Sequence, residues 1–441
     1  MAQVREILLS QNLKDLADRV SIHSVIPDLV VISGTGSSEV PVLDKVVVVS
    51  VGCATAVLRG ANVFAPGVLG VQSGVRKGEA VSVFADLRGT CLAGFKPTQE
   101  QLQQGGEAAF RHLGNGTLHL ARWQLFSSKS QVRKQQRGGL KDRQSIEDNT
   151  TAAESPELQQ GQPPPTTDTT LAVEMTAPVF PSPSFQGRVL ATFFPQNLPS
   201  TLVGHILDPR PGERVVDMCA APGGKTTHLA LLMRDTGTVV ALDAAAKRVE
   251  KLQQNVARYR LTCIRTFCRD ATNIRPLPVG PVEGESQEAA PVISQPSKRM
   301  EGEEELREGS FDRVLLDAPC SALGQRPCLH NTMGMAQLRG FPHYQRVLLR
   351  NAVYLLKPQG GTLVYSTCTI TPEENEEVVS WALRTIPGLR LVSQDPFVVG
   401  RPGLPGFGLD EREQRLVQRF DPTDPADTIG FFVAKFQIFS L

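Results

Sequence analysis

Two cysteines in the second half of the chain follow segments with the pattern of buried β-strands. Cys320 lies in an Asp-Ala-Pro-Cys-Ser turn after the strand predicted over 314–316, and Cys368 lies in a Ser-Thr-Cys-Thr turn after the strand predicted over 363–365. Ligands of a parallel sheet bind at the carboxyl ends of its strands, so both thiols should face the same ligand-binding crevice. A single cysteine there is more often a small core residue. Packing does not readily explain two, and the pair predicts thiol chemistry.

A glycine turn follows another predicted strand, over 213–217, and opens a helix that runs through Met233. The turn consists of Cys219, Ala220, Ala221, Pro222, Gly223, Gly224, Lys225 and Thr226. Backbone N–H groups at such a helix start bind anionic or polar ligands. A nucleoside triphosphate is one candidate, because the Gly-Lys-Thr end of the turn matches a P-loop. However, Cys219 stands where that pattern needs a glycine.

S-adenosylmethionine is the second candidate ligand. Its carboxylate and amino group would lie on the turn, and Asp243, at the end of the strand predicted over 238–243, would bind the ribose hydroxyls. The nucleoside triphosphate has one further point in its favour, because the strand that ends at Asp317 resembles the magnesium-binding strand of P-loop enzymes. Glycine turns occur in proteins that bind nothing, so the turn alone does not decide, but the acidic strand end at Asp243 favours the nucleoside.

Two thiols beside a methyl donor indicate transfer of a methyl group to cytosine C5. That carbon is a weak nucleophile until a thiolate adds at C6. Asp317, beside the Cys320 turn, would stabilise the adduct at the ring nitrogen N3 if its surroundings keep it protonated. The C5 proton must then leave, with a second thiol or an activated water assisting. Chemistry alone does not say which cysteine attacks.

The elements that must position these residues form an α/β domain, expected over 173–441. Strands are predicted over 213–217, 238–243, 311–317, 362–366 and 428–436, with helices over 245–259 and 346–356. A capping box at Thr371–Glu374 predicts a further helix to about Thr385. This order is typical of a doubly wound, Rossmann-like sheet. An acidic insert occupies 278–309.

The N-terminal part has a different pattern. Short Val-rich strands, such as 46–49 and 80–84, predict a small β-rich domain over 44–126. Residues 1–43, with a helical repeat over 4–20 and a strand over 28–33, are too few to close a core alone. Residues 127–172 have the composition of a disordered linker.

Composition excludes several classes of protein. The 441 residues suggest two or three domains, and a formal charge of +1 excludes a uniformly basic nucleic-acid binder. No apolar run is long enough for a membrane span, and no secretory signal is recognised. Eight cysteines without a C-x-x-C pair indicate a reducing, cytoplasmic environment and exclude the usual zinc spacings, so no metal is expected.

Five motifs, in order, resemble those of the Sun-domain RNA (cytosine-5-)methyltransferases. They are the 217–226 turn, Ala-Leu-Asp at 241–243, Cys-Arg-Asp at 268–270, Leu-Asp-Ala-Pro-Cys-Ser at 316–321 and Tyr-Ser-Thr-Cys-Thr at 365–369. The resemblance implies that Cys219 to Lys225, Asp243, Asp270 and Asp317 lie around S-adenosylmethionine. It also implies that Cys368 is the nucleophile and that Cys320 releases the product.

Residues 57–68 and 77–81 are similar to a PUA domain, an RNA-binding pseudo-barrel. A PUA domain before a Sun-type catalytic domain resembles the branch of the Sun-domain family member six type. The resemblance implies methylation of a cytosine beside the CCA end of transfer RNA and at similar motifs in messenger RNA, by a monomer. The alternatives are an RNA-binding protein without turnover and a P-loop NTPase.

Several features depart from the family or lie outside its motifs. The RRM-like N-terminal region is short, Ala322 replaces a glycine after Pro-Cys-Ser, and only Lys96 is basic near 91–94, which predicts weak affinity for tRNA. A basic run from Lys129 to Arg143 is either a contact to RNA phosphates or a solvated segment, whereas the acidic insert should lie off the RNA face. His205, His228 and His343 are expected to be packing or surface residues.

Overall fold

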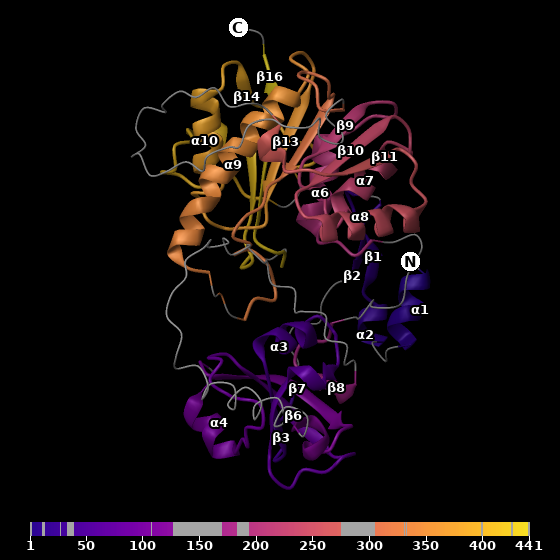
Figure 1. Ribbon diagram of the computed structural model, residues 1–441, viewed down its shortest axis with the longest axis vertical. Helices are drawn as coiled ribbons and strands as arrows, with labels where there is room; N and C mark the ends of the chain where they lie inside the picture. Colours follow the sequence, from indigo (N-terminus) through magenta and orange to yellow (C-terminus); the bar gives the residue numbers. More distant parts are fainter. Residues whose placement is uncertain are drawn as a thin grey trace, which may run out of the picture. The chain divides into compact units, whose positions relative to one another are not determined.

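The computed structural model describes residues 2–10, 14–26, 28–32, 39–106, 108–126, 170–182, 194–274, 305–329, 331, 333–397, 400–424 and 427–439. The chain forms two compact units (Figure 1). The larger unit comprises residues 24–29, 187–326 and 332–441, and the smaller unit comprises residues 1–23, 30–186 and 327–331.

The larger unit is built on an eight-stranded sheet. Its strands are β9 (Arg214–Asp217), β10 (Thr238–Asp243), β11 (Ile264–Cys268), β12 (Arg313–Asp317), β13 (Thr362–Thr367), β14 (Leu389–Leu391), β15 (Val417–Phe420) and β16 (Phe431–Ile438). The order is β11-β10-β9-β12-β13-β16-β14, with β15 also paired to β16. The first five of these run parallel, and β16 is antiparallel to β13. The predicted doubly wound α/β fold is therefore confirmed.

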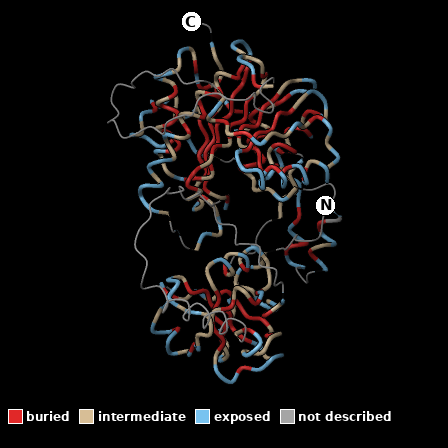
Figure 2. The backbone as a smooth tube through the Cα atoms, viewed as in Figure 1, coloured by how far each residue is buried: buried red, intermediate tan, exposed pale blue. Residues whose placement is uncertain are grey.

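Helices cover both faces of this sheet (Figure 1). They are α6 (Leu198–Leu207), α7 (Gly224–Leu232), α8 (Ala246–Tyr259), α9 (Met335–Leu355) and α10 (Glu376–Thr385), with a 3-10 turn η2 (Ala271–Asn273) and a short α11 (Glu411–Gln414). Alternate residues of the central strands face opposite layers: Val215 packs in the cluster of α6 and α7, and Val216 in that of α9 and α10. The central strands are buried on both faces, as their apolar runs require, and Figure 2 shows them as the buried centre of this unit.

The smaller unit has a six-stranded sheet in the order β4-β8-β7-β6-β3-β5. Its elements are β3 (Val46–Val49), α3 (Val51–Leu58), β4 (Val63–Phe64), η1 (Ala65–Gly67), β5 (Val68–Val71), β6 (Ala80–Asp86), α4 (Gln99–Gly105), β7 (Phe110–Leu118) and β8 (Leu171–Pro178). At the N-terminus, α1 (Ala2–Ser10) and α2 (Lys14–Ala17) precede the antiparallel pair β1 (Val20–Ile22) and β2 (Val30–Ile32). Valines of β3, β5 and β6 form its core.

Four details differ from the sequence expectations. Strand β8, expected to begin the α/β domain at 173, pairs with β4 and β7 because Val173 fills the core of the smaller unit. The helical repeat over 4–20 forms two helices, α1 and α2. Helix α9 begins at Met335, ahead of the expected 346. The acidic insert ends before its expected limit, since Leu306 is buried in the core of the larger unit.

The expected capping box before α10 is a fifth difference, and it bears on the site. The helix begins at Glu376, and its N-cap residue Asn375 makes no side-chain capping bond. Glu374 instead accepts hydrogen bonds from Thr371 and from the Cys320 turn. The basic run 129–143 and most of the predicted linker and insert lie outside the described residues.

Candidate active site

The two cysteines of the predicted pair lie side by side. Strands β12 and β13 are parallel neighbours, with Asp317 opposite Ser366, so the turns that follow them meet. The Sγ atoms of Cys320 and Cys368 are 3.4 Å apart. Cys320 is buried and Cys368 is partly exposed. The structure therefore brings the two sequence motifs into one site.

The thiols differ in acidity because they share one hydrogen bond. The hydrogen bond from Cys320 lowers the pKa of Cys368 below its ordinary value, against the effect of burial. The same interaction, together with burial, raises the pKa of Cys320 well above its ordinary value. Cys368 is thus the more acidic thiol of the pair, and Cys320 the less acidic one.

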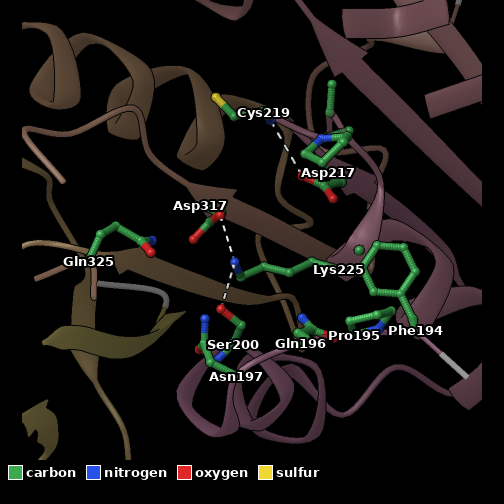
Figure 3. A pocket seen from close by; sticks show the side chains of 14 residues that line it. Phe194, Pro195, Gln196, Asn197, Ser200, Asp217, Cys219, Lys225, Asp317 and Gln325 are labelled. Atoms are coloured by element: carbon green, nitrogen blue, oxygen red, sulfur yellow. Dashed lines mark hydrogen bonds and ion pairs between the residues drawn. The ribbon is translucent and has the colours of Figure 1, made fainter. Parts of the chain in front are cut away.

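A lysine and an aspartate whose charges act on Cys368 point toward one another, as Figure 3 shows for Lys225 and Asp317. Lys225 Nζ is 2.8 Å from Asp317 Oδ2, and Ser366 donates to Asp317 Oδ1 at 2.6 Å. Burial would lower the pKa of Lys225, but the charge of Asp317 and its hydrogen bond outweigh burial and raise the pKa. Both oxygens of Asp317 therefore accept hydrogen bonds, one from Lys225 and one from Ser366.

The glycine turn is held by two buried aspartates. Asp243 Oδ2 accepts the Ala221 N–H at 3.2 Å and also lies 3.2 Å from the Arg248 guanidinium. Asp217 accepts the Thr226 hydroxyl at 2.7 Å. Burial raises the pKa of Asp217 to about 7, although the hydrogen bond from Thr226 opposes the rise.

Both glycines of the turn are required by its surroundings. Gly223 has a φ of +107°, and a Cβ there would lie 2.6 Å from Leu252 of α8. A Cβ on Gly224 would lie 2.7 Å from the Phe194 ring. The turn therefore keeps bare backbone close to helix α7, as a polar ligand needs.

A cavity of about 500 Å³ extends from this turn to Asp317 (Figure 3). It is lined by Phe194, Pro195, Gln196, Asn197, Ser200, Asp217, Cys219, Ala220, Ala221, Pro222, Gly224, Lys225, Asp317 and Gln325. The sequence analysis missed Phe194, Ser200 and Gln325. One signal was present: Asn197 followed by Leu-Pro-Ser is a helix start, and Asn197 indeed caps α6 by accepting the Ser200 N–H at 3.0 Å.

The turns that carry the thiols are tied together by Glu374. Its side chain is buried, and Oε2 accepts the Ser321 N–H at 3.0 Å and the Gln345 side-chain amide at 2.9 Å. Oε1 accepts the Thr371 hydroxyl at 2.8 Å. Since Ser321 follows Cys320 and Thr371 follows Cys368 by three residues, this carboxylate fixes one turn relative to the other.

Of the two remaining predicted residues, Asp270 does not line the cavity, whereas Cys219 does. Asp270 follows β11 and caps η2 by accepting the Thr272 N–H at 2.9 Å. Cys219 lines the cavity, and burial raises its pKa well above the ordinary value, so it remains a thiol. The predicted cofactor residues therefore surround the carboxyl ends of β9, β10 and β11.

Two of the three histidines assigned to packing share a partner. Asp28 lies 2.9 Å from His205 Nε2 through one oxygen and 3.1 Å from His228 Nε2 through the other. The hydrogen bond from His228 lowers the pKa of Asp28 to about 2. Among the described residues these three side chains form the one group of metal-ligating residue types that lie close enough together to share an ion.

In the described part of the chain, no helix is both long and apolar enough to span a membrane.

The residues of the site fit S-adenosylmethionine better than a nucleoside triphosphate. The ammonium of Lys225, which a P-loop would direct to phosphates, is bound to Asp317. The bare backbone of the turn supplies N–H donors for the amino acid part of S-adenosylmethionine. The buried Asp243 supplies the acidic strand end that binds the nucleoside part.

Comparisons with known proteins agree with this interpretation. The sequence model of the family "16S rRNA methyltransferase RsmB/F" matches residues 204–437, and that of the PUA domain matches residues 45–94. The tRNA (cytosine(72)-C(5))-methyltransferase NSUN6 of Mus musculus is 38% identical over 98% of this chain and 83% of its own length. The Homo sapiens protein of the same name is 40% identical over 88% of this chain and 74% of its own.

A solved structure is similar over nearly the whole chain. NSun6 from Pyrococcus horikoshii, crystallised with SFG, has a TM-score of 0.67 and 26% sequence identity, and the match covers 99% of this chain and 88% of that one. The family match overturns the P-loop NTPase alternative. The chain belongs to the RsmB/F family and is an S-adenosylmethionine-dependent RNA (cytosine-C5) methyltransferase with a PUA domain.

Proposed function

We propose that this enzyme forms 5-methylcytosine in transfer RNA beside the CCA end, and at similar motifs in messenger RNA, through a covalent adduct on Cys368. The observation that carries the proposal is the thiol pair at 3.4 Å, in which the pKa of Cys368 is lowered and that of Cys320 is raised. The names of the Mus musculus, Homo sapiens and Pyrococcus horikoshii relatives, all tRNA (cytosine(72)-C(5))-methyltransferases, support the choice of tRNA.

Each residue of the site then has a role. The Cys368 thiolate forms a bond to C6 of the cytosine, and the ring electrons move to N3, which takes a proton relayed from Lys225 through Asp317. C5 now has the electron density to accept a methyl group. A water molecule in the site accepts the C5 proton, and the electron pair left on C5 expels Cys368 as a thiolate. The hydrogen bond from Cys320 stabilises this departing thiolate. The proton on N3 returns through Asp317 to Lys225.

The cofactor side of the cavity has its own residues. Cys219, Ala220, Ala221, Pro222, Gly223 and Gly224 would hold the amino acid part, with Asp243 on the ribose and Asp270 near the base. When bound, S-adenosylmethionine supplies an electrophilic methyl group on sulfur. We place the enzyme in the cytoplasm as a monomer that needs no metal; all eight cysteines are free, as a reducing compartment would keep them.

The two thiols provide the test, because the mechanism gives them opposite phenotypes. Purified variants are incubated with labelled tRNA and S-adenosylmethionine and run on a denaturing gel, while bisulfite sequencing locates the product. Cys368→Ala should neither methylate nor crosslink. Cys320→Ala should accumulate a protein–RNA species, because its adduct is released slowly.

Other outcomes would replace the proposal. If Cys368→Ala traps RNA and Cys320→Ala is inert, the two roles are exchanged. If both variants turn over normally, covalent catalysis by these thiols is wrong. Wild-type protein that binds RNA and leaves no 5-methylcytosine would be an RNA-binding protein without turnover.

A further inference from the structure

The smaller unit carries an aromatic surface that the thiol chemistry does not use. Trp123, in the helical turn 122–126, is 71% exposed, the largest value among the exposed large apolar side chains of the described residues. It borders a hollow of about 580 Å³ whose other lining residues are Val75, Arg76, Lys77, Ala121, Arg122 and Phe126. These seven residues are called the Trp123 surface.

The backbone beneath Trp123 is firmly held. Arg122 donates to the carbonyls of Val71 at 2.8 Å and Phe95 at 3.0 Å, and its guanidinium lies 5.1 Å from the centre of the Phe126 ring. Leu125 is buried in the core of the same unit. The exposed indole is therefore presented from a rigid turn, which lowers the entropy lost when a ligand stacks on it.

The charge of the Trp123 surface is positive. Arg76 and Lys77 are both exposed, and the described residues that line the hollow include no carboxylate. The nearest acidic residue in sequence, Glu79, lies beside this surface, where its Oε2 accepts the Arg76 backbone N–H at 2.8 Å, but its charge is balanced by Lys45, 2.8 Å from Oε1. An exposed indole beside two cations fits a partner that combines a flat ring with a negative charge, which is the chemistry of an unpaired nucleotide.

We propose that the Trp123 surface binds an unpaired nucleotide of the RNA substrate, with its base stacked on Trp123 and its phosphate at Arg76 and Lys77. The proposal rests on the proposed function for the presence of RNA, and it adds a subsite in the smaller unit. Stacking tolerates any base, so this subsite contributes affinity rather than sequence selection.

The chain offers a spectroscopic test because it contains two tryptophans. Trp381 belongs to α10, near Arg346 and Arg350. In the full-length Trp381→Phe variant, Trp123 is the one remaining indole, and its emission reports on this surface alone. Titration with a single-stranded RNA 12-mer should quench the emission, whereas inorganic phosphate or a blunt duplex of the same sequence should not. If Trp381→Phe does not fold, the difference between wild-type protein and Trp123→Phe gives the same signal.

Affinity measurements complete the test. In fluorescence anisotropy with labelled RNA, Trp123→Ala should weaken binding by about 5- to 100-fold and Trp123→Phe by much less. Val42→Ala, at an apolar side chain that is 53% exposed in the same unit, is the matched control and should bind as wild type. Lys77→Gln should reduce the salt dependence of binding.

Three results would overturn the proposal: no quenching at RNA concentrations where anisotropy shows binding, wild-type affinity of Trp123→Ala, or a blue shift with anionic lipid vesicles in place of quenching by RNA. Failure of the proposed function is a separate result. Quenching by RNA that the enzyme does not methylate would leave this surface intact and remove the catalytic assignment.

Discussion

At the scale of single residues, hydrogen bonds between neighbouring side chains give the groups of the site unequal pKa values. Cys320 and Cys368 are chemically identical, yet one hydrogen bond lowers the pKa of one and raises that of the other. Lys225 is paired with Asp317 at 2.8 Å, and this partner raises the pKa of Lys225 in spite of its burial. Burial makes each pairing consequential, because an unpaired charge in these positions would be costly.

Asp217 is the residue whose ionisation should be visible in stability. Its pKa is about 7 in the folded protein, raised chiefly by burial, against about 3.9 in an unfolded chain. Folding therefore takes up a proton, so this contribution to stability is fully present below pH 3.9 and is lost as the pH rises toward 7. The loss approaches about 1.4 kcal/mol per pH unit within that window.

Asp217→Asn should remove this slope. Urea unfolding at pH 5, 6 and 7 measures it as the difference between wild type and variant. Thr226→Val is the companion change: it deletes the hydroxyl that favours the ionised form, so the window should extend to higher pH. Equal slopes for wild type and Asp217→Asn would mean that this carboxylate is ionised throughout the range.

At the scale of elements, two parallel strands deliver the thiols, and the turns after them set the distance between the sulfurs. The register of β12 and β13 places Asp317 opposite Ser366, but Cys320 and Cys368 lie beyond the last paired residues. Their separation depends on the hydrogen bonds that Glu374 accepts from both turns. This makes Glu374 a positioning residue.

Glu374→Gln should slow methyl transfer while leaving cofactor binding unchanged. The amide has one acceptor oxygen in place of two and presents an NH2 group to other donors, so hydrogen bonds worth about 1.5–3 kcal/mol are weakened. Single-turnover rates and calorimetric binding of S-adenosylmethionine measure the two effects. Thr371→Val, which removes one donor alone, should have a smaller effect. A loss of cofactor affinity equal to the loss of rate would point to general unfolding of the site.

Ala322 tests the conformation of the Cys320 turn. Its φ of +55° lies in the left-handed region, where an L-residue with a side chain costs about 1–2 kcal/mol. Ala322→Gly should relieve that cost, less the larger chain entropy of glycine when unfolded, and so raise stability by up to about 1 kcal/mol.

Thermal unfolding measures the change at Ala322, with Ala352→Gly in the buried part of α9 as a control that should lower stability. A lower melting temperature for Ala322→Gly would show that the methyl group contributes packing that outweighs the strain.

At the scale of the whole molecule, the thiol pair and the proposed nucleotide-binding surface lie on separate units. The smaller unit has its own sheet and valine core, and the larger unit contains the thiols and the cofactor residues. Removing charge outside the larger unit should therefore change RNA affinity without changing cofactor affinity.

The basic run 129–143 allows this to be measured. If Lys129, Arg133 and the basic residues that follow contact phosphates, the logarithm of RNA affinity falls with the logarithm of salt concentration, and deletion of residues 127–145 flattens the slope. Binding of S-adenosylmethionine to the deletion variant serves as the control and should equal that of wild type. An unchanged slope would assign the run to a solvated segment.

The sequence by itself determined the local elements and the motifs. Apolar runs bounded by glycine or aspartate located β9, β10, β12 and β13 to within two residues, because strands buried on both faces leave little choice of residue type. It also placed Cys320, Cys368 and Asp243 at strand ends. Such features depend on residues a few positions away in the chain, and they can therefore be predicted from the sequence.

Tertiary structure decided what depends on distant partners. Strand β8 belongs to the smaller unit because it pairs with β7 and β4, and no local sequence pattern indicates that pairing. Glu374 does not act as the predicted capping residue. Its carboxylate instead accepts the N–H of Ser321, which is 53 residues away in sequence. The pairing of Asp317 with Lys225 and the unequal pKa values of the two thiols likewise arise from contacts between residues far apart in sequence. Proton affinities follow from charge and burial in three dimensions, which residue types alone do not specify.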